Sequence, residues 1–177
     1  CPDGIGTLFK VTTNGLVTTL VSFTGTNGAN PYAALTLGND GHFYGTTVYG
    51  GITNSTWRTG MGTVFKVTNN GSVTTLVCLT GINGAYQEDV LTIGQHGNFY
   101  GTTARGGITN STEPYGWGTV FQVMTNGTLT TLVTFGFTNG SLPRAALTLG
   151  NDGDFYGTTA AGGITNSTDP TGMGTVF

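Results

Sequence analysis

The stretch Phe43-Tyr44-Gly45-Thr46-Thr47 decides the fold of this chain, because it returns twice at one fixed spacing. The same five residue types occupy 99–103 and 155–159, so the sequence repeats with a period of 56 residues. A second motif, Gly-Gly-Ile-Thr-Asn-Ser-Thr, follows each copy and begins at Gly50, Gly106 and Gly162. A fixed period of this size predicts an array of equivalent units that bury their core between neighbours.

Four segments of each period have the alternation and composition of β-strands. In the first full period they are 33–37, 43–47, 62–67 and 73–79. Asn-Gly pairs at 14–15, 70–71 and 126–127 predict tight hairpins between the third and fourth strands. We therefore predict an all-β fold of tandem four-stranded antiparallel blades, β-propeller-like or an open stack of blades, with strand 33–37 innermost.

The alternation along 43–47 also predicts how this strand meets its neighbours. Phe43 and Thr47 should face one neighbouring blade, and Tyr44 and Thr46 the other. Gly45 should allow a close approach of backbones at this position.

The chain is expected to form one repeat array, 1–177, with incomplete units at both ends. Residues 1–23 would supply strands three and four of a blade, 33–79 and 89–135 would be whole blades, and 145–177 would supply strands one and two and the start of strand three. Three arrangements fit: a window of a longer array, two chains that close one ring, or strand completion between successive copies, which gives a fibre if the rotation does not close.

The composition argues against two kinds of partner. Charged residues make up 7% of the chain, and the net charge of the chain is -3. The five basic residues are scattered along the sequence. Nucleic acid is not expected, because phosphate binding needs clustered Lys and Arg. A membrane span is not expected either, because no apolar run approaches about 18 residues. The chain begins at Cys1 rather than Met, and we expect that a leader or a longer N-terminal part precedes it.

The repeat resembles a known family through Gly-Thr-Val-Phe-Lys-Val-Thr at 62–68, Leu-Gly-Asn-Asp-Gly at 37–41 and Phe-Tyr-Gly-Thr-Thr with Gly-Gly following. It is similar to the GloVer-type choice-of-anchor tandem-repeat family of secreted bacterial proteins, and the likeness covers essentially the whole chain. The resemblance implies export, residence outside the cell or on its surface, and a propeller-like β fold. The sequence departs from the family in having no recognisable anchor segment.

The conserved loop motif within the repeats also contains glycosylation triplets. The candidates are the amides of Asn54, Asn110 and Asn166 or the adjacent hydroxyls of Ser55, Thr56, Ser111, Thr112, Ser167 and Thr168. The alternative is that loops rich in Asn, Ser and Thr generate such triplets by composition.

Two cysteines, Cys1 and Cys78, could form a disulfide in an oxidising compartment, or Cys78 could be a small apolar filler. The Asn39-Asp40-Gly41 stretch is faintly similar to a calcium loop, but it has no closing acid and is better explained as a hairpin turn. We predict no metal and no cofactor.

Catalysis needs a histidine or paired carboxylates that the fold brings together. Glu88 and Asp89 are adjacent but occur in one repeat, and we interpret them as part of a solvated loop. We therefore predict that the chain is not an enzyme. Aromatic residues could instead stack on sugars, namely the repeated Tyr44, Tyr100 and Tyr156 and the loop residues Trp57, Tyr115 and Trp117.

The function predicted from the sequence is that of a non-enzymatic extracellular structural protein. It would associate with copies of itself, either as a homo-oligomer or as a fibril built by blade or strand complementation, and carry sugars as a glycoprotein. The alternative is a propeller on the bacterial surface that binds glycans or protein partners.

Overall fold

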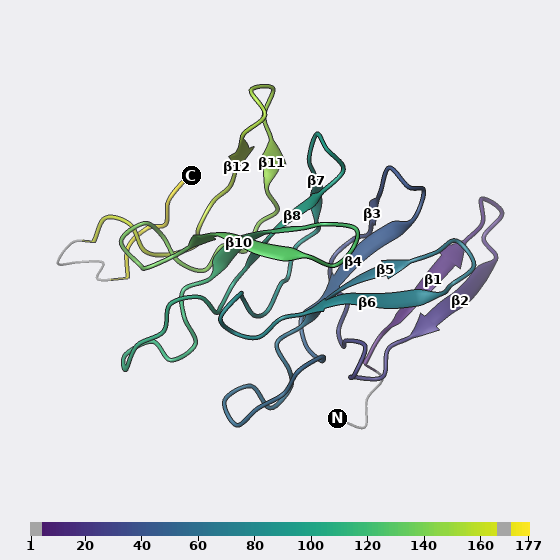
Figure 1. Ribbon diagram of the computed structural model, residues 1–177, viewed down its shortest axis with the longest axis horizontal. Helices are drawn as coiled ribbons and strands as arrows, with labels where there is room; N and C mark the ends of the chain where they lie inside the picture. Colours follow the sequence, from purple (N-terminus) through teal and green to yellow (C-terminus); the bar gives the residue numbers. More distant parts are fainter. Residues whose placement is uncertain (1–4, 166–170) are drawn as a thin grey trace.

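The computed structural model describes residues 5–165 and 171–177 of the chain (Figure 1). These residues form twelve β-strands and no helix, so the prediction of an all-β fold is confirmed. The strands are β1 (Thr7–Val11), β2 (Val17–Ser22), β3 (Thr36–Leu37), β4 (Phe43–Thr47), β5 (Thr63–Val67), β6 (Val73–Cys78), β7 (Thr92–Ile93), β8 (Phe99–Thr103), β9 (Thr119–Val123), β10 (Leu129–Thr134), β11 (Thr148–Leu149) and β12 (Phe155–Tyr156).

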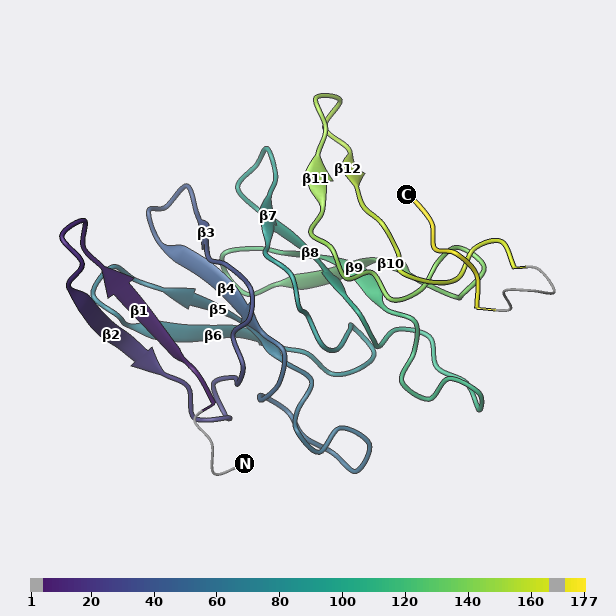
Figure 2. The same ribbon diagram turned by 180° about the vertical axis from the view of Figure 1, so that it is seen from behind.

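The strands pair into four small antiparallel sheets. Two sheets have four strands, in the orders β3-β4-β5-β6 and β7-β8-β9-β10, and two have two strands, β1-β2 and β11-β12. Figures 1 and 2 show the sheets following one another side by side, from β1–β2 at one end to β11–β12 at the other. Sheets arranged in this way are the blades of a propeller-like array.

The inner strand of each blade is shorter than predicted. The ladder between β3 and β4 holds Thr36 and Leu37 but not residues 33–35. These strands instead connect neighbouring blades, because the hydroxyl of Thr36 donates a hydrogen bond to the carbonyl oxygen of Leu91 at 2.5 Å. Thr92 repeats this contact with the carbonyl oxygen of Leu147, also at 2.5 Å.

The glycine of the repeated Phe-Tyr-Gly-Thr-Thr motif makes room for an aromatic ring. Gly45 of β4 pairs with Phe65 of β5. A Cβ atom on Gly45 would lie 2.6 Å from Cζ of the Phe65 ring. In the next blade, a Cβ atom on Gly101 would lie 2.7 Å from Cζ of Phe121. A larger residue would collide with a fully buried ring, so this position favours glycine. The glycine therefore accommodates side chains, and the prediction that backbones approach each other here is wrong.

The last threonine of the same motif joins the second strand to the third. The hydroxyls of Thr47 and Thr63 are hydrogen-bonded at 2.9 Å, and both side chains are buried. Thr103 and Thr119 form the equivalent pair at 2.8 Å. The glycine and the last threonine of the motif therefore make their contacts within one blade.

The hydrophobic core lies between blades. Tyr44 and Val64 of one blade pack with Phe99, Phe121 and Val123 of the next. The ring of Tyr44 stacks on that of Phe99 with 4.1 Å between centroids. This contact agrees with the predicted orientation of Tyr44 toward a neighbouring unit.

The opposite side of the same strands faces the preceding blade. Phe43 packs against the core cluster that contains Leu8, Phe23, Phe65 and Val67. Each blade consequently has two different faces, one that meets the preceding blade and one that meets the following blade.

Candidate functional site

The sheet β1–β2 leaves its face toward the N-terminal end of the array uncovered. We call this the N-terminal face; it consists of Phe9, Val11 and Val17, each of which is more than half exposed. Phe9 is 59% exposed, whereas Phe65, at the same repeat position one blade later, is 1% exposed. Phe65 is buried because the preceding sheet covers it, with the ring of Phe23 edge-on at 5.3 Å between centroids.

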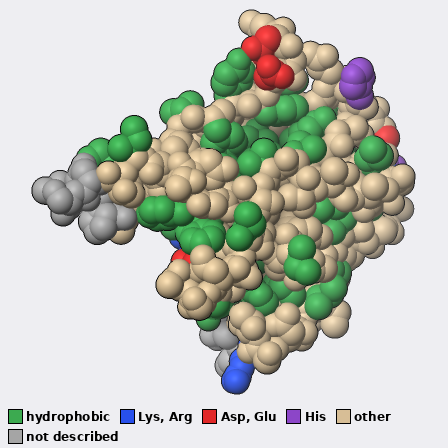
Figure 3. Space-filling view, turned by 60° about the vertical axis from the view of Figure 1, so that its left-hand side comes forward, with side chains coloured by type: hydrophobic (Ala, Val, Ile, Leu, Met, Phe, Trp, Pro, Cys, Tyr) green, Lys and Arg blue, Asp and Glu red, His purple; other side chains and the backbone are tan. Residues whose placement is uncertain are grey.

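The other end of the array exposes the opposite type of blade face. We call this the C-terminal face; it consists of Leu132, Tyr156 and Val176. Val176 is 79% exposed, whereas the equivalent Val64 is fully buried against the next blade. Figure 3 shows this side of the molecule, with hydrophobic side chains gathered below the acidic tip at the top. The tip is the turn between β11 and β12, which contains Asp152 and Asp154.

The two end faces have the residue types that pack together inside the array. Val64 and Tyr44 in the middle of the chain correspond to Val176 and Tyr156 of the C-terminal face. Phe121 and Val123, which cover Val64 and Tyr44, correspond to Phe9 and Val11 of the N-terminal face. The ends are therefore chemically complementary.

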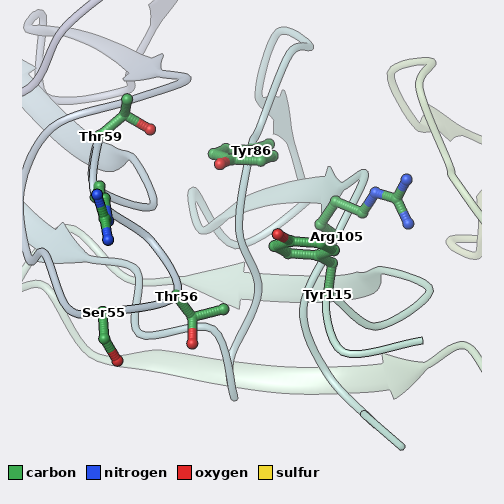
Figure 4. A pocket seen from close by; sticks show the side chains of 7 residues that line it. Ser55, Thr56, Thr59, Tyr86, Arg105 and Tyr115 are labelled. Carbon is green, nitrogen blue, oxygen red and sulfur yellow. The ribbon is translucent and has the colours of Figure 1, made fainter. Parts of the chain in front are cut away.

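A cleft of about 550 Å³ lies between the loop that follows β4 and the adjoining loops of the next blade (Figure 4). We call it the loop cleft. It is lined by Ser55, Thr56, Arg58, Thr59, Tyr86, Arg105 and Tyr115. Figure 4 shows Thr59 on one side of this cleft and Arg105 with Tyr115 on the other, with Tyr86 between them.

The backbone holds two cleft residues next to each other. Ala85 and Arg105 form an antiparallel bridge, in which the Ala85 N–H donates to the Arg105 carbonyl oxygen at 2.8 Å. The Tyr86 carbonyl oxygen accepts a hydrogen bond from the Ala104 N–H at 3.1 Å. Tyr86 and Arg105 thereby leave adjoining segments at fixed positions.

Three aromatic rings support the loop cleft. Trp57 is buried, and its ring lies edge-to-face with Tyr86 at 5.0 Å and with Tyr115 at 5.3 Å between centroids. Tyr86 also meets Tyr49 edge-to-face at 5.2 Å. Such contacts restrict ring motion and leave the exposed parts of the Tyr86 and Tyr115 rings available to a ligand.

The aromatic residues predicted to bind sugars separate into two groups. Tyr44 is fully buried and belongs to the core, and Trp57 is buried as well. Trp117 packs toward Phe137 at 6.5 Å between centroids. Tyr115 is the one member of the predicted set that lines the loop cleft.

Tyr100 and Tyr156 stay with the blade faces. The Tyr100 ring stacks on Phe155 at 4.0 Å between centroids, and Tyr156 belongs to the C-terminal face.

The sequence analysis did not identify Tyr86, Arg58 and Arg105 as cleft residues. One signal was available: Tyr86 and Arg105 replace Asn30 and Tyr49 of the preceding repeat, where the surrounding motifs are unchanged.

The asparagines of the predicted glycosylation motif have a structural role in the loop. Asn54 Oδ1 accepts hydrogen bonds from the N–H groups of Thr56 and Trp57, at 2.9 and 2.8 Å. Asn110 Oδ1 does the same in the next unit. This turn explains why asparagine recurs here, while the side chains of Ser55, Thr56, Ser111 and Thr112 are exposed. Asn166, Ser167 and Thr168 lie outside the described residues.

The cysteine and calcium-loop candidates have these environments. Cys78 is a free, half-buried thiol whose pKa is raised by burial, and Cys1 lies outside the described residues.

The carboxylate of Asp40, in the stretch compared with a calcium loop, accepts hydrogen bonds from the Tyr44 hydroxyl and from Lys66 Nζ, each at 2.8 Å. Burial opposes ionisation of Asp40, but the hydrogen bonds from Lys66, Tyr44 and the His42 N–H hold its pKa at about 2. The Asp40 oxygens therefore stabilise a hairpin turn.

The acidic pair before β7 differs from the solvated loop that the sequence suggested. Burial, together with the neighbouring carboxylate of Glu88, raises the pKa of Asp89 to about 6. Asp89 is withdrawn from water because it lies between two blades: the Thr46 hydroxyl of one blade donates to its carbonyl oxygen at 3.4 Å, and the Thr102 hydroxyl of the next donates to its carboxylate, also at 3.4 Å. Gln87 beside it is buried, and its Oε1 has no hydrogen-bond partner among the described residues.

Two further findings concern the predicted absences. Among residues 5–165 and 171–177, His, Cys, Asp and Glu side chains do not gather in groups of three that could hold a metal ion. The same residues contain no helix with the length and apolar character of a membrane span.

A comparison with protein families identifies the family of the repeat. The model of the Gloeobacter/Verrucomicrobia repeat matches residues 2–177. The chain belongs to this repeat family. The resemblance inferred from the repeated motifs is thereby confirmed, and the family description places such repeats in bacteria. No curated protein sequence matches the chain.

A solved structure shares the fold. A luciferin-regenerating enzyme matches with a TM-score of 0.56 and 17% identity, over 98% of this chain and 51% of that chain. A putative gluconolactonase matches with a TM-score of 0.49 and 12% identity, over 97% of this chain and 56% of that chain. The chain thus spans about half the length of these structures. The predicted β-propeller-like class is confirmed by the first of them.

The prediction that the chain is not an enzyme is wrong, since the fold is shared with a luciferin-regenerating enzyme. The exclusion rested on the absence of a recognisable catalytic motif and on the view of Glu88 and Asp89 as solvated. A half-buried carboxyl group with a pKa near 6, such as that of Asp89, is instead a feature that active sites use. At 17% identity the likeness concerns the fold and not the reaction.

Proposed function

We propose that this chain is an extracellular structural repeat protein of bacteria that associates with copies of itself through its two end faces. The observation that carries the proposal is the exposure of Phe9 at a repeat position where Phe65 and Phe121 are buried by a neighbouring blade. Removing apolar surface from water stabilises an association by roughly 25 cal/mol per Å². The C-terminal face of a second copy offers the residue types that cover this position inside the array.

The geometry of such a contact follows from the difference between the two faces. Because the N-terminal face of one copy meets the C-terminal face of another, the contact is heterologous. Copies joined in this way form a closed ring if the rotation closes and a fibre if it does not. Pairing of the β1–β2 hairpin with strands of a neighbouring copy would add main-chain hydrogen bonds.

The test uses one variant for each face. Phe9→Asp and Val176→Asp replace exposed side chains, so both variants should fold, which circular dichroism and thermal melting check. We expect the unmodified chain to form oligomers or filaments in light scattering and electron microscopy, and each variant alone to be monomeric. A mixture of the two variants should form a dimer and nothing larger, because one intact N-terminal face and one intact C-terminal face remain.

The control is Ile82→Asp, at an exposed loop position where the other units have Thr26 and Thr138. This variant should assemble like the unmodified chain. A monomeric unmodified chain would refute the proposal, and so would a mixture of the two face variants that stays monomeric.

Residence outside the cell and glycosylation are part of the same proposal. They are supported by the family resemblance and by the exposure of the loops that carry Asn54 and Asn110. Protein purified from its bacterial source should be found in the medium or on the cell surface, with an intact mass above that of the bare chain. A cytoplasmic location, or a mass equal to the bare chain, would overturn the corresponding part.

A further inference from the structure

We infer that the loop cleft binds a linear acidic oligosaccharide, that is, a chain of sugars that carry carboxylates. The cleft combines ring faces, guanidinium groups and hydroxyls in one hollow of about 550 Å³. This site is separate from both end faces, so the inference does not depend on self-association.

The tyrosine rings provide the surface for the apolar faces of sugar rings. In Figure 4 the rings of Tyr86 and Tyr115 are seen edge-on and lie roughly parallel to each other. Both are held from the side by the buried Trp57, at 5.0 and 5.3 Å between centroids. A rigid aromatic surface loses little conformational entropy when a ligand binds.

The arginines provide the charge selection. The chain contains five basic residues, and two of them, Arg58 and Arg105, line this cleft. Within the described part of the chain, no ion pair involves Arg58, whereas Arg105 Nη1 contacts Glu113 Oε1 at 2.9 Å. Of the two cleft arginines, Arg58 is therefore the one without an ion-pair partner among the described residues, in a protein whose net charge is -3. Guanidinium groups bind carboxylates strongly because they donate two parallel hydrogen bonds.

The placement of these groups favours a chain over a single sugar. Thr59, which follows Arg58 in the chain, lies on one side of the cleft, and Arg105 lies on the other, beyond Tyr86 (Figure 4). Arg58 and Thr59 also line a second cleft of about 680 Å³, which extends toward Thr24 and Tyr49. A linear ligand could pass from one cleft to the other across Arg58.

The internal repeat shows that the blade does not require an aromatic ring at the position of Tyr86. A positive φ occurs at the Tyr86 position in three units, at Asn30 (56°), Tyr86 (57°) and Leu142 (55°). Asparagine tolerates this backbone conformation, while other side chains are strained in it. The blade is built without an aromatic ring in the units of Asn30 and Leu142, so the backbone at this position does not explain why Tyr86 is aromatic.

The test is isothermal titration calorimetry with trigalacturonic acid, galactotriose and galacturonic acid. The protein is produced so that its intact mass equals the bare chain, which keeps sugars off Ser55 and Thr56. We expect trigalacturonic acid to bind at least about tenfold more tightly than uncharged galactotriose, because charged hydrogen bonds are the stronger ones. It should also bind more tightly than the single sugar, and less tightly in high salt.

Variants connect the binding to the cleft. Arg58→Gln and Arg105→Gln should each weaken trigalacturonic acid binding by about tenfold, a typical effect of losing a charged hydrogen bond. Tyr115→Thr, which installs the residue found at Thr59 and Thr171, should weaken it as well without affecting folding. Arg144→Gln is the matched control, because Arg144 pairs with Glu88 at 3.2 Å and does not line the cleft.

Three results would overturn the inference. The first is the absence of binding by trigalacturonic acid. The second is equal affinity for trigalacturonic acid and for galactotriose or galacturonic acid. The third is an equal loss of affinity in Arg144→Gln and in the cleft variants, which would mean that trigalacturonic acid binding depends on the net charge of the protein and not on the cleft.

Discussion

Replacing Phe65 by alanine should destabilise the array far more than replacing Phe9, although the two residues occupy the same position of the repeat. Phe65 is 1% exposed, and its ring lies over Gly45 and against Phe23. Its removal would leave a cavity that the surrounding β-sheets cannot close, so we expect a loss of about 3–5 kcal/mol. That is a large fraction of the roughly 5–15 kcal/mol that a domain has.

Phe9 provides the matched comparison. Its ring is 59% exposed, so alanine at this position gives up roughly two fifths of the burial of a core phenylalanine and leaves no enclosed cavity. We expect a loss of about 1 kcal/mol, from the about 1.5–3 kcal/mol that full burial of such a side chain contributes. The difference between the two variants should therefore be about 2–4 kcal/mol.

The assay is urea denaturation followed by circular dichroism. Both substitutions are made in a Val176→Asp background, so that the proposed association does not stabilise one of them. Equal m-values are required for the comparison, since the denatured states must be equally exposed. Similar losses in the two variants would refute the reasoning, because the packing between blades would then not determine stability.

Three further outcomes follow from the described contacts. Above pH 6, Asp89→Asn should be more stable than the unmodified chain by about 1 kcal/mol after solvent screening. The reason is that a raised pKa of Asp89 means that its ionisation destabilises the folded state. Urea midpoints measured at pH 4 and 7.5 should show that this advantage vanishes at low pH. Gly106→Ala should lower stability by at least about 2 kcal/mol in the same assay, because φ is 89° and the new Cβ would lie 2.5 Å from the Gly81 carbonyl oxygen; an unchanged midpoint would contradict this. Asp40, with a pKa lowered to about 2, contributes stability that is present above its ordinary pKa of 3.8 and is lost as the pH falls toward 2. Asp40→Asn should therefore make stability less dependent on pH between 3.8 and 2. An acid transition identical to that of the unmodified chain would count against the Lys66 contact.

The sequence by itself determined the period, the strand types and the order of strands in each blade. These follow from local rules: Asn-Gly fixes the hairpins, alternation fixes which side chains share a face, and exact repetition requires every unit to adopt the same structure. Alternation also predicted correctly that Tyr44 and Phe43 face different neighbouring blades, and the structure then showed that Tyr44 meets the following blade.

Tertiary structure decided what depends on neighbours that are distant in the chain. Phe9 and Phe65 lie in nearly identical local sequences. Phe65 is buried because a preceding sheet covers it, and Phe9 is exposed because no described sheet does. Asp89 was interpreted as solvated because it follows Glu88 in a loop and occurs in one repeat, but the blades on both sides withdraw it from water. The loop cleft likewise joins Arg58 to Tyr86 and Arg105 through the packing of two units. Periodicity specifies one unit, whereas burial, charge and cavities arise where two units meet.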